Sequence, residues 1–150
     1  MEMNVVSQLK DLGIAGSLAF SAIGSALGAG VAGMSAVGSW KKCFAQNKNA
    51  PFILTVFVGA PLSQTIYGMI VMNALIELAN KGQFMWAAGI FGGLAMGMSA
   101  WMQGKAGASA ADAMAETGKG FGNYLMVLGI IETVALFVMV FILMAVGKIG

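Results

Sequence analysis

Four long apolar stretches separated by short polar connections make up most of the 150-residue chain. They cover residues 12–40, 51–76, 84–111 and 121–147. Each is long enough to cross a bilayer as a helix at about 1.5 Å per residue. Pro51 is expected in the first turn of the second stretch. The pattern predicts an all-α membrane protein with four transmembrane helices in one membrane domain, residues 1–150.

The chain also repeats itself. Residues 25–36 and 99–110 match at seven of twelve positions with an offset of 74. The second and fourth stretches align with an offset of 68, which places Gln64 opposite Glu132. We therefore expect two duplicated helical hairpins in the same orientation, residues 12–76 and 84–147. The second hairpin would carry the essential carboxylate.

Composition excludes several classes of chemistry. The chain is 59% apolar and 9% charged, against about 25% charged residues in soluble domains. It has no histidine and no arginine, which removes imidazole catalysis and arginine clamps on phosphate. The net charge of +2 is too small to indicate a nucleic-acid partner, and the single Cys43 cannot form an internal disulfide. The first apolar stretch exceeds a signal-peptide core, so we expect it to be retained.

The lysines predict an orientation in the cell membrane. Four lie on the side of the first and third connections and three on the opposite side: Lys41, Lys42, Lys48 and Lys119 against Lys10, Lys81 and Lys148. Because lysine is enriched on the cytoplasmic side, loops 41–50 and 112–120 are predicted to be cytoplasmic and both termini external.

The first and third stretches are rich in glycine, and the other two in bulky apolar residues. Gly24 and Gly28 are spaced by four, as are Gly89, Gly93 and Gly97. Small residues at this spacing let helix backbones approach closely. Two such helices alternating with two bulky ones suit a two-layered ring of many copies, with the small helices on the inner circumference.

Glu132 is the only charge in the last stretch before Lys148. An unpaired carboxylate there would cost several kcal/mol. Glu132 is therefore protonated, paired or holding a cation.

Further polar groups are expected near the same depth. They are Gln64, Ser63 and Tyr67 on the second stretch and Gln103 on the third. Pro61 lacks an N–H, so nearby carbonyls such as that of Ala60 are freed from helical bonding. These are hard oxygen donors with one negative charge, which suits Na⁺ better than Ca²⁺. The alternatives are a protonated Glu132, interhelical bonding by the glutamines, back-bonding by Ser63 and plain packing of Tyr67. Lys105 is expected to point away from these groups.

These residues resemble a known family. The duplicated glycine-rich hairpin, with PLSQTIYG, SAWMQGKAGASA and IET, is similar to the proteolipid (K or c) subunit of V-type ATPases, in its bacterial sodium-pumping branch. The resemblance implies a rotor ring of identical subunits in the lipid bilayer. It implies that Na⁺ is held by the ligands Glu132, Gln64, Gln103, Ser63 and the Ala60 carbonyl, with Tyr67 bonded to Glu132.

It further implies a non-catalytic subunit that binds no nucleotide, because other subunits hydrolyse ATP. Its partners would be a stator subunit with half-channels and a central stalk that contacts loops 41–50 and 112–120. Two alternatives remain at this point: a ring of the same family that carries protons, and a stand-alone four-helix transporter. A purely structural scaffold would leave Glu132 unexplained.

Overall fold

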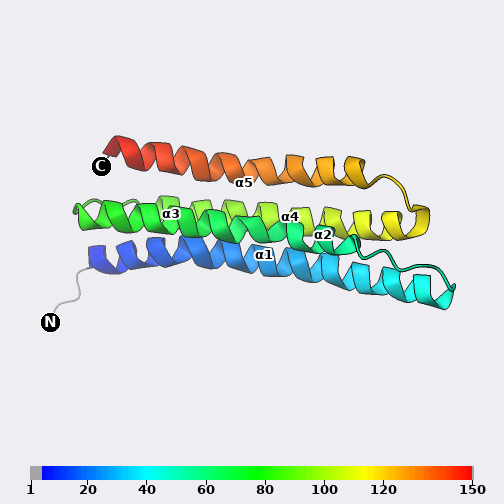
Figure 1. The fold of residues 1–150 in the computed structure, drawn as a ribbon. Coiled ribbons are helices and arrows are strands. Elements are labelled where there is room, and N and C mark those ends of the chain that lie inside the picture. The colour runs from blue at the N-terminus through cyan, green and yellow to red at the C-terminus, as the bar shows by residue number, and fades with distance from the viewer. Residues whose placement is uncertain (1–4, 150) are drawn as a thin grey trace.

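The computed structural model describes residues 5–149 as a bundle of long helices lying side by side (Figure 1). The first, third and fourth apolar stretches form continuous helices: α1 (Val5–Ala45), α4 (Trp86–Thr117) and α5 (Phe121–Ile149). The second is divided into α2 (Leu54–Gly59), a 3₁₀ turn η1 (Ala60–Leu62) and α3 (Ser63–Asn80). The predicted four-helix arrangement is confirmed, while residues 1–4 and 150 lie outside the described residues.

Both hairpins turn at the same end of the bundle. The connections after α1 and after α4 lie at one end, and the start of α1 and the end of α5 lie at the other (Figure 1). At the turning end, Lys42 Nζ lies 2.9 Å from Asp112 Oδ1 and joins α1 to α4. This is the arrangement expected of two hairpins in the same orientation.

The helix ends differ from the predicted ranges. The second helical segment begins at Leu54, so Pro51 precedes it and its carbonyl accepts a hydrogen bond from Trp40 Nε1 at 2.8 Å. The helix after it ends at Asn80 rather than near residue 76. Most of the predicted loop 112–120 is helical, because α4 continues to Thr117. Gly118 caps this helix in the left-handed conformation, with a φ of 64°, and its N–H donates to the Met114 carbonyl.

Three helical stretches among the described residues are long and apolar enough to cross a membrane: Gln8–Ala45, Leu54–Asn80 and Phe121–Ile149. Helix α4 is long enough but falls short of the same apolar composition, so a membrane crossing by residues 84–111 stays a prediction. Helix α4 contacts α1, α3 and α5.

The two glycine-rich helices pack directly on each other. The contact between α1 and α4 is the most extensive in the bundle. A Cβ added at Gly24 would fall on the backbone of Gly97, and one added at Gly104 would fall on the backbone of Gly28. Backbones this close admit no side chain between them. The small-residue spacing therefore marks the main helix interface.

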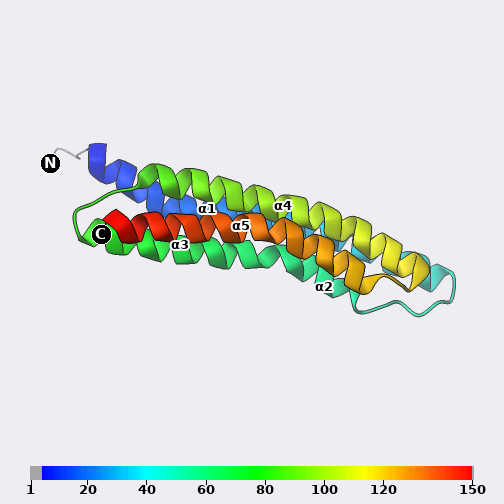
Figure 2. The same ribbon diagram turned by 90° about the horizontal axis from the view of Figure 1, so that it is seen from above.

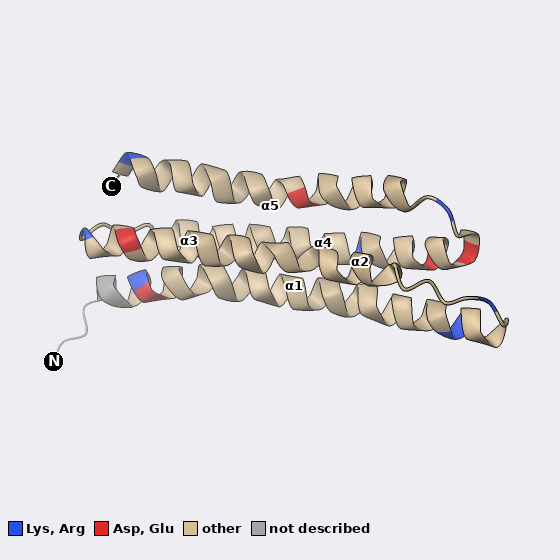
Figure 3. Cartoon of the chain, viewed as in Figure 1, with Lys and Arg blue, Asp and Glu red and all other residues tan. Residues whose placement is uncertain are grey.

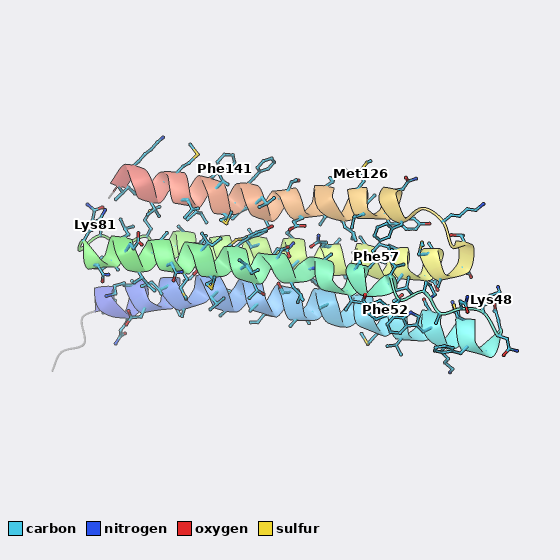
Figure 4. The ribbon with its side chains drawn as sticks, viewed as in Figure 1. Lys48, Phe52, Phe57, Lys81, Met126 and Phe141 are labelled. Atoms are coloured by element: carbon cyan, nitrogen blue, oxygen red, sulfur yellow. The ribbon has the colours of Figure 1, made fainter. Side chains whose placement is uncertain are left out.

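The helices enclose a shared interior around which α1, α4, α5 and α3 are arranged, as the view turned by 90° shows (Figure 2). Phe57 is fully buried near Phe121 and Tyr124 of α5. In contrast, Met126 and Phe141 project from the outer side of α5 (Figure 4). The helix that carries Glu132 thus has one side in the bundle and one apolar side outside it.

Candidate functional site

The interruption of the second helical stretch positions the first half of the site. Pro61 cannot donate to the carbonyl four residues earlier, and the chain forms the 3₁₀ turn η1 at that point. The Phe57 carbonyl oxygen faces α4, since a Cβ added at Gly107 would lie 2.8 Å from it. The Ala60 carbonyl accepts the Ser63 hydroxyl at 3.2 Å. The Phe57 carbonyl therefore faces a neighbouring helix, whereas the Ala60 carbonyl is bonded within its own stretch, which is the back-bonding that the sequence analysis left open for Ser63.

A chain of hydrogen bonds continues from Ser63 across to α4. Ser63 Oγ donates to Gln64 Oε1 at 3.2 Å, and Gln64 Nε2 donates to Gln103 Oε1 at 2.7 Å. Both glutamine side chains have no exposed surface. Buried amides at this depth must be satisfied within the protein, because the bilayer core offers no water. The two glutamines satisfy each other.

Glu132 of α5 ends this chain and accepts two hydrogen bonds. Tyr67 Oη donates to Oε1 at 2.6 Å, and Gln103 Nε2 donates to Oε2 at 3.2 Å. The same Gln103 nitrogen donates to the Leu128 carbonyl at 3.1 Å. That carbonyl requires an N–H, so it fixes the Gln103 amide with its nitrogen toward Glu132. Both carboxylate oxygens are thereby held by donors.

The structure thus brings together every residue that the sequence marked for the site, from α3, α4, α5 and the 3₁₀ turn. Their role as ion ligands stays a prediction, because it concerns an ion. Tyr67 bonds the carboxylate directly. Lys105 lies outside the group, with its Nζ 4.0 Å from the centre of the Trp101 ring.

Sequence reasoning missed two contributors. Ser99 Oγ donates to the Ile131 carbonyl at 2.8 Å and joins α4 to α5 beside Glu132. The Leu128 carbonyl orients Gln103. The sequence offered a way to identify Ser99, because it matches Ser25 in the internal repeat. A backbone carbonyl leaves no such feature in the sequence.

Glu132 lies apart from most of the other charged residues. Most charged segments lie at the two ends of the bundle, and α5 carries an acidic segment away from both of its ends (Figure 3). Glu132 is the one acidic residue of α5. Among the described residues, no group of three His, Cys, Asp or Glu side chains could hold a metal ion. Glu132 supplies the negative charge of the site and is in contact with the Tyr67 hydroxyl and the Gln103 amide nitrogen.

Comparisons with known proteins agree with this arrangement. The model of the ATP synthase C-subunit family matches residues 86–145, which contain both Gln103 and Glu132. The A-type ATP synthase subunit K of Methanocaldococcus jannaschii is 33% identical over 139 residues, 91% of this chain. The chain resembles the c- and K-type proteolipids of rotary ATPases. It spans 58% of the length of that archaeal relative.

The residues matched by the family model lie in the second hairpin. That hairpin supplies the acid, Gln103 and Ser99. Gln64 and Tyr67 come from the first hairpin, outside the matched residues. The group of residues around Glu132 is therefore built from both hairpins.

Proposed function

We propose that the chain is one subunit of a membrane rotor ring that carries Na⁺ on Glu132 in a rotary ATPase. Identical subunits would form the ring, with one carrier carboxylate for each group of four helices. The subunit itself would be non-catalytic, with ATP hydrolysed by other subunits. The observation that carries the proposal is the direct bonding of Glu132 to Tyr67 and Gln103, with Gln64 next in the chain.

The groups around Glu132 suit an ionised carboxylate. Tyr67 Oη and Gln103 Nε2 lie within hydrogen-bond distance of its two oxygens. An ionised carboxylate accepts from both, whereas a protonated one would donate to Tyr67 Oη and is the alternative that sodium competition tests. An ionised carboxylate at this depth needs a compensating positive charge. A bound Na⁺ supplies it and leaves the site neutral.

Suitable oxygen ligands lie nearby. Ser63 Oγ lies 3.2 Å from both the Ala60 carbonyl oxygen and Gln64 Oε1, so three of the proposed ligands are already grouped. Gln103 Oε1 faces Gln64 Nε2 at 2.7 Å, and a turn of the Gln64 amide alone would let both amide oxygens face a shared cation while Gln103 keeps its bond to Leu128. Glu132 completes the set.

The proposal includes partners. A stator subunit would deliver Na⁺ to Glu132 and remove it through two half-channels, and the partly exposed position of this residue suits such exchange. The connections at the turning end, predicted to be cytoplasmic, would meet a central stalk. The orientation is part of the proposal.

Carbodiimide labelling of the purified protein tests the carried ion. The reagent modifies a protonated carboxyl in an apolar setting, so Na⁺ bound to Glu132 should slow the reaction. We expect fast labelling at low sodium and protection as sodium rises. The variant Glu132→Gln should abolish the labelling and identifies the residue. Fast labelling that is indifferent to sodium would contradict a sodium carrier and support a ring that carries protons.

A further inference from the structure

Ser25 of α1 has a buried hydroxyl that no hydrogen-bond partner satisfies within the described chain. Its side chain is 2% exposed. Ser17 and Ser21 lie on the same helix face and donate to the carbonyls of Ile14 and Ser17, each at 2.8 Å. Ser25 does not repeat this pattern. A buried hydroxyl left unsatisfied in a membrane-spanning helix is costly and requires an explanation.

Helix packing places Ser25 beside the first half of the site. A Cβ added at Gly68 would lie 2.6 Å from Ser21 Oγ, and one added at Gly28 would lie 3.0 Å from the Cβ of Pro61. Because α1 and α3 run in opposite directions, a residue between 21 and 28 is level with the segment between 68 and 61. Ser25 is therefore level with Ser63 and Gln64.

The internal repeat indicates what Ser25 is placed to bind. The offset of 74 makes Ser25 the counterpart of Ser99, and the offset of 68 makes Ser63 the counterpart of Ile131. Ser99 donates to the Ile131 carbonyl at 2.8 Å, immediately before Glu132. The equivalent contact in the first hairpin would join Ser25 to the Ser63 carbonyl, immediately before Gln64.

The two hairpins differ at this level. Helix α5 is continuous past Ile131, whereas the segment before Ser63 is the 3₁₀ turn η1. The single Ser63 hydroxyl hydrogen has two acceptors within 3.2 Å, the Ala60 carbonyl and Gln64 Oε1. Both hairpins therefore carry a serine at the equivalent position. Ser99 is hydrogen-bonded beside the continuous helix α5, whereas Ser25 has no partner among the described residues beside the stretch that is interrupted at Pro61.

We propose that Ser25 is a positioning residue of the Glu132 site, whose hydroxyl donates to the Ser63 carbonyl when the carried cation is bound. The inference rests on the function proposed above. If Gln64 turns its amide oxygen to the cation, its Nε2 leaves Gln103 Oε1 and that bond is lost. The segment that carries Ser63 and Gln64 then needs another anchor, which Ser25 supplies.

The test compares two buried serines of α1. Ser39 is the matched control, because its hydroxyl is also buried and unsatisfied in the described chain but lies near the turning end. The sodium concentration that halves carbodiimide labelling of Glu132 is measured for the wild-type protein, Ser25→Ala and Ser39→Ala. We expect an increase of about tenfold for Ser25→Ala and less than about twofold for Ser39→Ala, with labelling rates at zero sodium unchanged.

The role of Ser25 would be overturned if the sodium concentration that halves labelling were the same in Ser25→Ala as in the wild type. An equal change of that concentration in Ser25→Ala and Ser39→Ala would also overturn it. Ser25→Cys, a similar side chain with a weak donor, replaces the alanine variant if that variant does not assemble. If sodium fails to protect even the wild type, the sodium function fails separately. Ser25 is then judged by the pH of half-maximal labelling: a shift confined to Ser25→Ala supports the role, and coincident curves overturn it.

Discussion

At the scale of single residues, the Tyr67 hydroxyl is the closest hydrogen-bond donor to the carboxylate. It lies 2.6 Å from Glu132 Oε1. A hydrogen bond to a charged group contributes about 1.5–3 kcal/mol, and each 1.36 kcal/mol is a factor of ten in affinity. We expect Tyr67→Phe to weaken Na⁺ binding by about tenfold in isothermal titration. Tyr124→Phe is the control, and a comparable loss in that variant would show that the effect is unspecific.

The two buried glutamines should differ in importance. Gln103 bonds Glu132, Leu128 and Gln64, whereas Gln64 reaches Glu132 only through Gln103. Loss of Gln103 also leaves a buried carbonyl without its donor, which adds to the cost. We expect Gln103→Leu to weaken Na⁺ binding more than Gln64→Leu, by about tenfold or more, with ring assembly retained.

The measurement is Na⁺ affinity by titration, with oligomer mass as the check on assembly. Unchanged affinity in both variants would mean that the glutamines are interhelical hydrogen-bonding groups and not ligands.

The sequence identified the site residues that are unusual in an apolar stretch. Glu132 was evident as a charge in an apolar stretch, and Gln64 because the repeat aligned it with Glu132. Their indirect connection through Gln103 depends on the register of three helices, which sequence spacing does not determine. Ser99 was missed because a serine in a membrane helix commonly bonds its own helix, as Ser17 and Ser21 do.

At the scale of helices, the α1–α4 interface depends on glycines that admit no side chain. A Cβ at Gly24 would fall on the Gly97 backbone, whereas one at Gly38 would meet nothing within 4 Å. Alanine favours helix by about 1 kcal/mol over glycine, but overpacking costs about 1–3 kcal/mol. We expect Gly24→Ala to lower the thermal midpoint in detergent and Gly38→Ala to preserve or raise it. Equal midpoints for the two variants would contradict this interface.

Helix existence was more predictable than helix ends. Long apolar runs indicated four helices because a bilayer sets their minimum length. The connections are short polar sequences that can extend a helix, and α4 continues to Thr117 for this reason. Pro61 predicted a local disturbance, but its form as a 3₁₀ turn depends on packing against α1 and α4, where Gly28 accommodates it.

At the scale of the whole molecule, one ion pair joins the hairpins at their turning end. Asp112 accepts a hydrogen bond from Lys42 and attracts its charge, which raises the pKa of Lys42 above the usual 10.5. The pair therefore contributes stability below pH 10.5 and loses it as pH rises through the higher folded-state pKa. Both side chains are at least half exposed, so solvent screens the contribution.

We expect Lys42→Ala to lower the thermal midpoint at pH 8 by about 2 °C or less, with the difference vanishing above the folded-state pKa. Lys41→Ala is the control for removing an exposed lysine at this end of the bundle. A difference between Lys42→Ala and the wild type that grows as pH rises would contradict the assigned ion pair.

The outer side of α5 carries the last prediction, because one copy of the chain leaves this side uncovered. Within α5, Leu128 and Ala135 are buried, while Met126, Ile130 and Phe141 are each more than 60% exposed. Lipid can cover such a surface, but a carrier that exchanges its ion with a stator must also present Glu132 repeatedly as copies move past it. A closed ring meets both requirements. We expect the detergent-solubilised protein to show one discrete native mass that is a large multiple of 15.4 kDa and constant with protein concentration. A monomer or dimer would contradict the rotor and favour a stand-alone transporter.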